Sequence, residues 1–228
     1  MRTNFEQRLE GLEAKLDQMG QLLRSQLDRT LAALATSDEG VADEVIRRDQ
    51  LLDADYVEIE EEILRTLALE APVAKDLRLV AGVLHMNLHL ERMGDLCVNM
   101  ARFVKLAGHD QPDPEIRATL AEMGEHARRL VDTALECFAR RDVELAERLP
   151  IMDQPLDELN ERVFRQLDLA AERGLTPGPW ASRMVLVARY LERIGDHSVD
   201  IGEQVVFIVT GEVRELVPPK SVRAQVEL

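Results

Sequence analysis

Eight carboxylates, arranged in four pairs of identical spacing, are the residues of this sequence best suited to chemistry. In each pair the two acids stand four positions apart, so on a helix both would project from the same face. Carboxylate oxygens suit Mg²⁺, Ca²⁺, Mn²⁺ or iron, and bridging carboxylates can hold more than one ion. The pairs are Asp49/Asp53, Glu91/Asp95, Asp153/Asp157 and Glu192/Asp196.

A plainer interpretation is that these acids are solvated outer faces of helices, which are common in an acidic chain. Two glycines favour a site instead. Gly94 and Gly195 each lie between the two acids of a pair, although a glycine inside a helix costs about 1 kcal/mol relative to alanine. They indicate a close helix approach or room for a ligand, with a small-residue packing contact as the plain alternative. Asn99 and Asp200, one turn further along, are added to the candidate ligands.

Histidine and cysteine offer weaker candidates. His85 and His89 are four residues apart, but the second half of the chain has no matching pair, which favours a surface or packing role. His197 directly follows the last acid pair and is expected to point to another part of the helix. Cys97 and Cys137 lack metal-type spacing and are expected to be buried, reduced thiols.

The acids lie in segments whose apolar residues recur with the helical period of 3.6. Thr36 and Glu39 match a capping box at the start of the second helix. Asp113 can cap the fourth helix, and Gly211 can end the last one. Six helices are predicted, over residues 4–35, 36–69, 72–106, 114–140, 142–172 and 180–210.

The two halves of the chain repeat the same landmarks in the same order. The second half follows the first by 104 residues at Asp49-Gln50-x-x-Asp53 and by 101 at Leu90-Glu91-Arg92-x-Gly94-Asp95. The difference falls in the turn before each third helix, where deletions are tolerated. We therefore predict an all-α fold of two tandem three-helix bundles related by internal duplication, each about 45 Å long. Residues 1–109 form the first, and residues 110–228 form the second with a short C-terminal tail.

Composition narrows the classes of function that the chain can have. The chain has 43 acidic and 28 basic residues, a formal net charge of −15, and such a surface repels nucleic acid unless a basic patch is present. No such patch is visible in the sequence. The charged N-terminus resembles no signal peptide, and no apolar run is long enough to span a bilayer. These features predict a cytoplasmic protein.

Two segments resemble the signature repeats of the PhoU family, regulators of phosphate-specific transport: LHLERMGDLCVNMA and ARYLERIGDHSVDIGE. The resemblance covers nearly the whole chain and implies a cytoplasmic homodimer with multinuclear metal clusters, iron favoured and Mn, Mg, Zn or Ca as alternatives. It assigns the ligands to the eight paired acids. It also implies repression of phosphate uptake and of the phosphate-starvation response, through contacts with the importer's ATPase subunit and the sensor histidine kinase.

We therefore expect a non-enzymatic regulator, because the sequence has no Gly-rich phosphate loop and no nucleophile constellation. The first alternative is a di-metal carboxylate enzyme of the ferritin-like type. Such sites need Glu-x-x-His, and none of the five histidines has a glutamate three residues before it. The second alternative is a metal-free helical scaffold.

Overall fold

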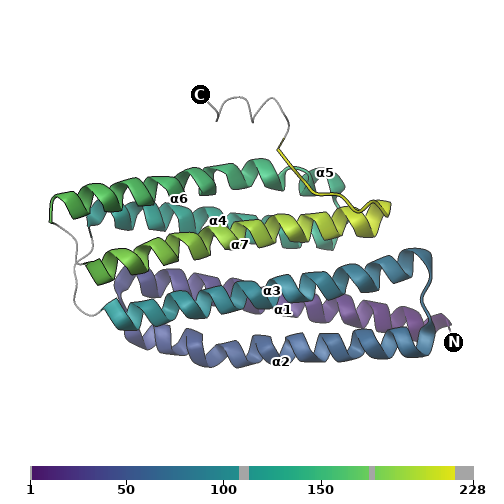
Figure 1. Cartoon of the computed structure of the whole chain (residues 1–228). Helices are drawn as coiled ribbons and strands as arrows, with labels where there is room; N and C mark the ends of the chain where they lie inside the picture. The colour runs from purple at the N-terminus through teal and green to yellow at the C-terminus, as the bar shows by residue number, and fades with distance from the viewer. Residues whose placement is uncertain (1, 108–112, 175–177, 219–228) are drawn as a thin grey trace.

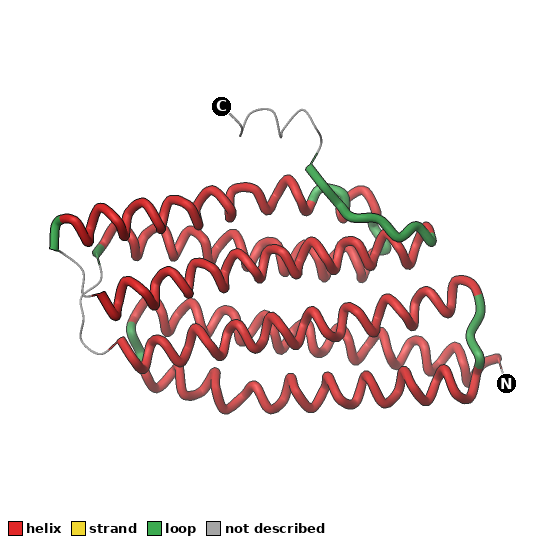
Figure 2. Tube along the Cα trace, viewed as in Figure 1, coloured by secondary structure: helices red, strands yellow, loops and turns green. Residues whose placement is uncertain are grey.

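The computed structural model describes residues 2–107, 113–174 and 178–218, and over these residues its regular structure is entirely helical (Figures 1 and 2). Three long helices form the first unit and three the second, with one extra helical turn between α4 and α6. The helices are α1 (Arg2–Thr36), α2 (Glu39–Glu70), α3 (Ala74–Ala107), α4 (Pro114–Arg140), α5 (Val143–Ala146), α6 (Leu149–Glu172) and α7 (Gly178–Thr210).

Each unit is a bundle closed by its apolar stripes, and this confirms the predicted fold of two duplicated three-helix bundles. Leu12, Leu16, Met19 and Leu23 of α1 are fully buried at the helical spacing expected. The two units share one continuous core, because α3 packs against α7 and α1 against α4. The predicted boundary between residues 109 and 110 lies outside the described residues. No described helix is both long enough and apolar enough to cross a bilayer.

Helices α3 and α7 run side by side in opposite directions and form the main contact between the units (Figure 1). At one end, Gly82 lets α7 approach closely, because a Cβ there would lie 2.5 Å from Ile208. At the other end, the rings of Phe103 and Tyr190 stack with centroids 5.9 Å apart. Between these two ends, the third long helix of one unit therefore packs against the third long helix of the other.

Two predicted helix ends are confirmed and one is wrong. Asp113 caps α4 by accepting a hydrogen bond from the Glu115 backbone N–H, and Gly211 ends α7 with φ at +82°. The Thr36/Glu39 capping box does not form. Thr36 is the last residue of α1, and its hydroxyl donates to a carbonyl of that helix. Asp38 caps α2 instead.

The single helix predicted over residues 142–172 is also corrected, because the structure divides it into α5 and α6. Asp142 caps α5 by accepting a hydrogen bond from the Leu145 N–H. Pro150 then occupies the first turn of α6, where a residue without an N–H is tolerated because that turn has no helical partner for it. The third helix likewise begins at Ala74, two residues after the predicted Pro72.

Candidate metal centres

In the first unit, α2 and α3 place their acid pairs on facing surfaces. Asp49 is the more enclosed acid of α2, and its Oδ1 accepts a hydrogen bond of 2.8 Å from Nε2 of Gln26 on α1. Gly94 lets α2 approach closely, since a Cβ at that position would lie 3.0 Å from Leu52 Cδ2, one turn from Asp49. The glycine between the acids therefore serves the close helix approach that the sequence indicated.

The charges of the first set act on one another. Burial is the main cause that raises the pKa of Glu91, and the negative charges of Asp95, Asp53 and Asp49 raise it further. Burial also raises the pKa of Asp49, with further contributions from Asp53 and Asp95. All four acids predicted in this unit thus lie within electrostatic reach of each other, although they come from two helices.

The second unit repeats the arrangement in a tighter form. Asp153 of α6 is only 8% exposed, and a Cβ on Gly195 of α7 would overlap its Oδ1. Burial, followed by the charges of Asp157, Asp196 and Glu192, raises the pKa of Asp153 to about 8. A carboxyl with this pKa is protonated in part at neutral pH unless a cation compensates its charge.

Three carboxylate oxygens of the two sets are buried and have no hydrogen-bond partner among the described residues. They are Glu91 Oε2, Asp153 Oδ1 and Glu192 Oε2. Buried polar atoms are nearly always paired in folded proteins. A cation bound between the helices would supply the missing partner, so the donor set fits a metal ion.

The carboxylates do not, however, form a compact single-ion cage. In the part of the chain that the structure describes, neither acidic set has three ligand atoms within 4.8 Å of one another. Within each set, no three of the described residues bring their oxygens as close together as the ligands of one small ion. Such spacing suits bridging by more than one ion, or by an ion with bound waters, better than direct ligation of one ion by all four residues.

Arginines balance part of this charge. Arg92 lies 3.6 Å from Glu91 and 4.0 Å from Asp95. In the second unit Arg189, three residues before Glu192, forms the ion pair with that glutamate. The first unit has Leu88 at the position equivalent to Arg189, so the repeat itself does not predict this ion pair.

The second set opens into an acidic groove of about 820 Å³ between α6, α7 and the segment after α7. That segment is held by Leu216, which is buried and whose N–H donates to Glu203 at 2.8 Å. Of the first set, Asp53 lines a shallow depression beside α2. The acids lining the groove are Asp153, Asp157, Glu158, Glu161, Asp196, Asp200, Glu203 and Glu215.

Asn99 and Asp200, the two further candidate ligands, lie in different environments. Asn99 accepts a hydrogen bond of 3.1 Å from Arg102 on the exposed face of α3. Asp200 borders the groove, but its Oδ2 also lies 3.5 Å from the Nδ1 atoms of His89 and His197. Nothing in the sequence pattern predicts the pairing of these two histidines, which α3 and α7 bring together from different units.

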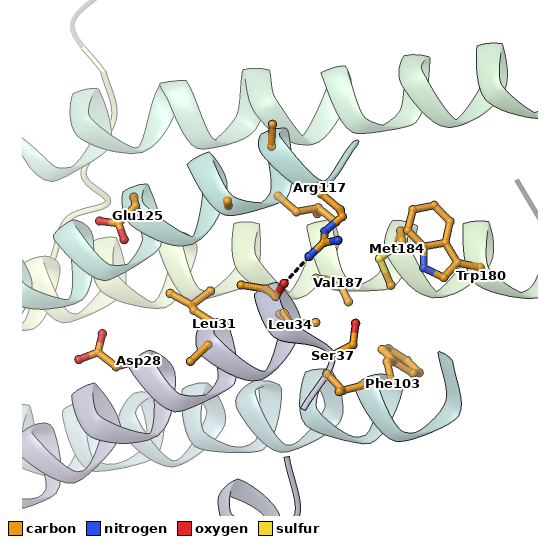
Figure 3. A pocket seen from close by; sticks show the side chains of 16 residues that line it. Asp28, Leu31, Leu34, Ser37, Phe103, Arg117, Glu125, Trp180, Met184 and Val187 are labelled. Carbon is orange, nitrogen blue, oxygen red and sulfur yellow. Dashed lines mark hydrogen bonds between the residues drawn. The ribbon is translucent and has the colours of Figure 1, made fainter. Parts of the chain in front are cut away.

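A second hollow, of about 580 Å³, lies between the units near the ends of α1 and α3 and is mostly apolar (Figure 3). Arg117 crosses it and donates a hydrogen bond to the Ala35 carbonyl. Its acids, Asp28 and Glu125, stand apart from each other in Figure 3. This cavity therefore lacks the converging ligands of a cation site. Its apolar lining includes Leu31, Leu34, Phe103, Trp180, Met184 and Val187.

Comparison with known proteins identifies the repeat. The model of the PhoU domain matches residues 16–104 and 120–205. A phosphate-specific transport system accessory protein PhoU homolog of Clostridium acetobutylicum is 30% identical over 93% of this chain and 97% of its own. A PhoU homolog 1 of Mycobacterium tuberculosis is 33% identical over 92% of this chain and 95% of its own.

Solved structures agree with the sequence relatives. The crystal structure of PhoU from Pseudomonas aeruginosa has a TM-score of 0.86 and 30% identity, covering 91% of this chain and all of that one. The phosphate transport system regulatory protein PhoU from Streptococcus pneumoniae also has a TM-score of 0.86, at 26% identity, over 93% of this chain and all of that one.

Proposed function

The chain belongs to the PhoU family, and we propose that it is a phosphate transport accessory protein whose two acidic sites bind metal ions. The bound ions stabilise the conformation in which the protein acts as a regulator. One observation carries the proposal: the same four carboxylates recur in both units, at the same helix junction, around a glycine that brings the helices together. In both units the glycine lowers helix propensity and the acids repel one another. Binding of the same kind of ligand in each unit explains why both accept this cost.

The donor chemistry favours hard cations. Every predicted ligand offers oxygen, which suits iron, Mn²⁺, Mg²⁺ or Ca²⁺, with Zn²⁺ a further candidate. The unpartnered oxygens of Asp153 and Glu192 would each gain a positive neighbour, and Glu91 Oε2 would gain a second one besides Arg92. The wide spacing within each set favours more than one ion per site. Bound ions would hold the second and third helices of each unit together.

The regulatory role is proposed to be negative and non-enzymatic. Relatives of high similarity are named as accessory proteins of phosphate-specific transport, which supports a cytoplasmic protein that contacts the transport system. We propose that the partners are the importer's ATPase subunit and the phosphate-sensing histidine kinase, and that the chain acts as a homodimer. Contact with both would couple uptake to the starvation response.

The test uses two variants with equal change of charge. The site variant carries Glu91→Gln, Asp95→Asn, Glu192→Gln and Asp196→Asn. The control carries Glu10→Gln, Asp17→Asn, Asp168→Asn and Glu172→Gln, all at exposed positions. Each replaces the native chain in cells that report phosphate-starvation transcription at high phosphate.

We expect the site variant to derepress the reporter and to lose bound metal, while the control behaves as the native chain. Co-purification of the native chain with the ATPase subunit tests the partner directly. Full repression by a metal-depleted site variant would refute the metal-dependent role and leave the family assignment intact. Absence of ATPase co-purification at both high and low phosphate would refute that partner.

A further inference from the structure

Two histidines and one aspartate meet where the two units pack together, beside the acid set of the second unit. His89 comes from α3, and His197 and Asp200 come from α7. The two Nδ1 atoms are 3.2 Å apart, and each lies 3.5 Å from Asp200 Oδ2. The imidazoles are only 18% and 15% exposed. Within the described residues, this is the one group of three or more His, Cys, Asp or Glu side chains whose ligand atoms all lie within 4.8 Å.

The triangle formed by these three atoms has the dimensions of a transition-metal site. With sides of 3.2, 3.5 and 3.5 Å, the point equidistant from its corners lies about 2.0 Å from each atom, close to the bond lengths of about 2.0–2.2 Å for zinc to histidine or carboxylate. Tetrahedral coordination at those lengths separates ligands by about 3.3–3.6 Å. The ion would therefore need little movement of the side chains.

We propose that His89, His197 and Asp200 bind one divalent transition-metal ion, Zn²⁺ by preference, which joins the two units through α3 and α7. Two imidazoles and one carboxylate are the ligands of many open zinc sites, whereas Mg²⁺ and Ca²⁺ prefer oxygen alone. Asp200 is 41% exposed, which leaves a route for the ion and a fourth position for water.

A hydrogen bond between the two Nδ1 atoms is the alternative explanation for their contact. That bond accounts for one distance of the triangle, whereas an ion accounts for all three.

One feature limits the affinity. When Nδ1 of His197 binds a metal, the proton resides on Nε2, and this atom is buried without a hydrogen-bond partner among the described residues. Metal-binding histidines usually donate this N–H to a partner, and loss of such a partner weakens binding about 10- to 100-fold. We therefore expect weaker binding than at a structural zinc site.

The cluster is not a third copy of the repeated sites. The offset of 101 residues places Tyr190, Leu96 and Asn99 at the positions equivalent to His89, His197 and Asp200. The equivalent set has no imidazole and no carboxylate. Over the residues that the structure describes there is one such cluster, which predicts one ion per chain, whereas the acid pairs predict two equivalent centres.

The test is a Zn²⁺ titration of the full chain by calorimetry, in millimolar Mg²⁺ so that oxygen-only sites are occupied by a harder ion. The first variant is His89→Gln. The second is Asp200→Asn, which copies the residue of the first unit at this position and keeps the side-chain shape. His126→Gln on α4, outside the cluster, is the control.

We expect one equivalent of Zn²⁺ in the native chain and in the control. X-ray absorption should show two imidazoles around the ion, and both cluster variants should bind at least about 10-fold more weakly. Because the ligands come from both units, Zn²⁺ should raise the unfolding temperature of the native chain and not that of His89→Gln.

Equal zinc affinity in the native chain and His89→Gln, or a zinc shell of oxygen alone, would overturn the proposal. Unfolding of the metal-free variants shows that each is folded before titration. The outcome is independent of the acid pairs, since a chain whose acid pairs bind nothing would still bind Zn²⁺ at the histidines.

Discussion

The buried carboxyl of Asp153 makes the stability of the metal-free protein depend on pH. Burial, then the charges of Asp157, Asp196 and Glu192, raises its pKa from 3.8 to about 8. Between these values the folded chain retains a proton that the unfolded chain has released, so the free energy of unfolding falls as pH rises. The stabilisation is complete below pH 4 and is lost as the pH passes through 8.

The slope for one such group is about 1.4 kcal/mol per pH unit, or at most about 6 kcal/mol over the whole window. Asp153→Asn removes this titration while keeping the shape of the side chain. We expect the variant in EDTA to be more stable than the native chain at pH 8, by several kcal/mol, and to show a flatter dependence on pH.

The assay is urea unfolding followed by circular dichroism from pH 5 to 8 in EDTA, with Asp168→Asn as an exposed control. Added Mn²⁺ should stabilise the native chain at pH 8 more than it stabilises Asp153→Asn, because the variant keeps only the site of the first unit intact and has no Asp153 charge for the cation to compensate. Parallel pH curves for the native chain and Asp153→Asn would refute the burial and charge argument for this site.

Two further predictions concern packing and thiols. Gly195→Ala should destabilise the protein by about 1–3 kcal/mol in urea unfolding and weaken metal binding, because the new Cβ displaces Asp153. Gly11→Ala, with no atom within 4 Å of its Cβ, should stabilise it by about 0.5–1 kcal/mol; equal effects of the two would contradict this account. Burial raises the pKa of Cys97 and Cys137 to about 12, so a thiol-specific disulfide reagent should label neither before unfolding, and rapid labelling of the folded chain would show them accessible.

Much of the architecture follows from local patterns. The stripe of α1 and the acid spacing each depend on residues within two turns of helix, where period and side-chain direction are fixed. The duplication also identifies both acid sets, because equivalent helices pack equivalently. Cys97 and Cys137 are buried and free, as expected from their places in helical patterns and from their lack of metal-type spacing.

Local patterns could not predict which of two competing residues caps a helix, or which side chains meet where the two units pack together. Thr36 and Asp38 both offer a side-chain oxygen near the start of α2, and the structure uses Asp38, since α1 continues through Thr36. Pairing of His89 with His197 depends on the register of α3 against α7, which no pattern within one unit records. The only hint in the duplication is that the second unit has Asp200 where the first has Asn99.

The most direct test of the central claim is anomalous diffraction from crystals of the native chain grown with Mn²⁺. Bound ions should give peaks between α2 and α3 beside Asp49 and Glu91, and between α6 and α7 beside Asp153 and Glu192. Ordered carboxylates with no anomalous peak at either place would contradict metal binding by the repeated acids.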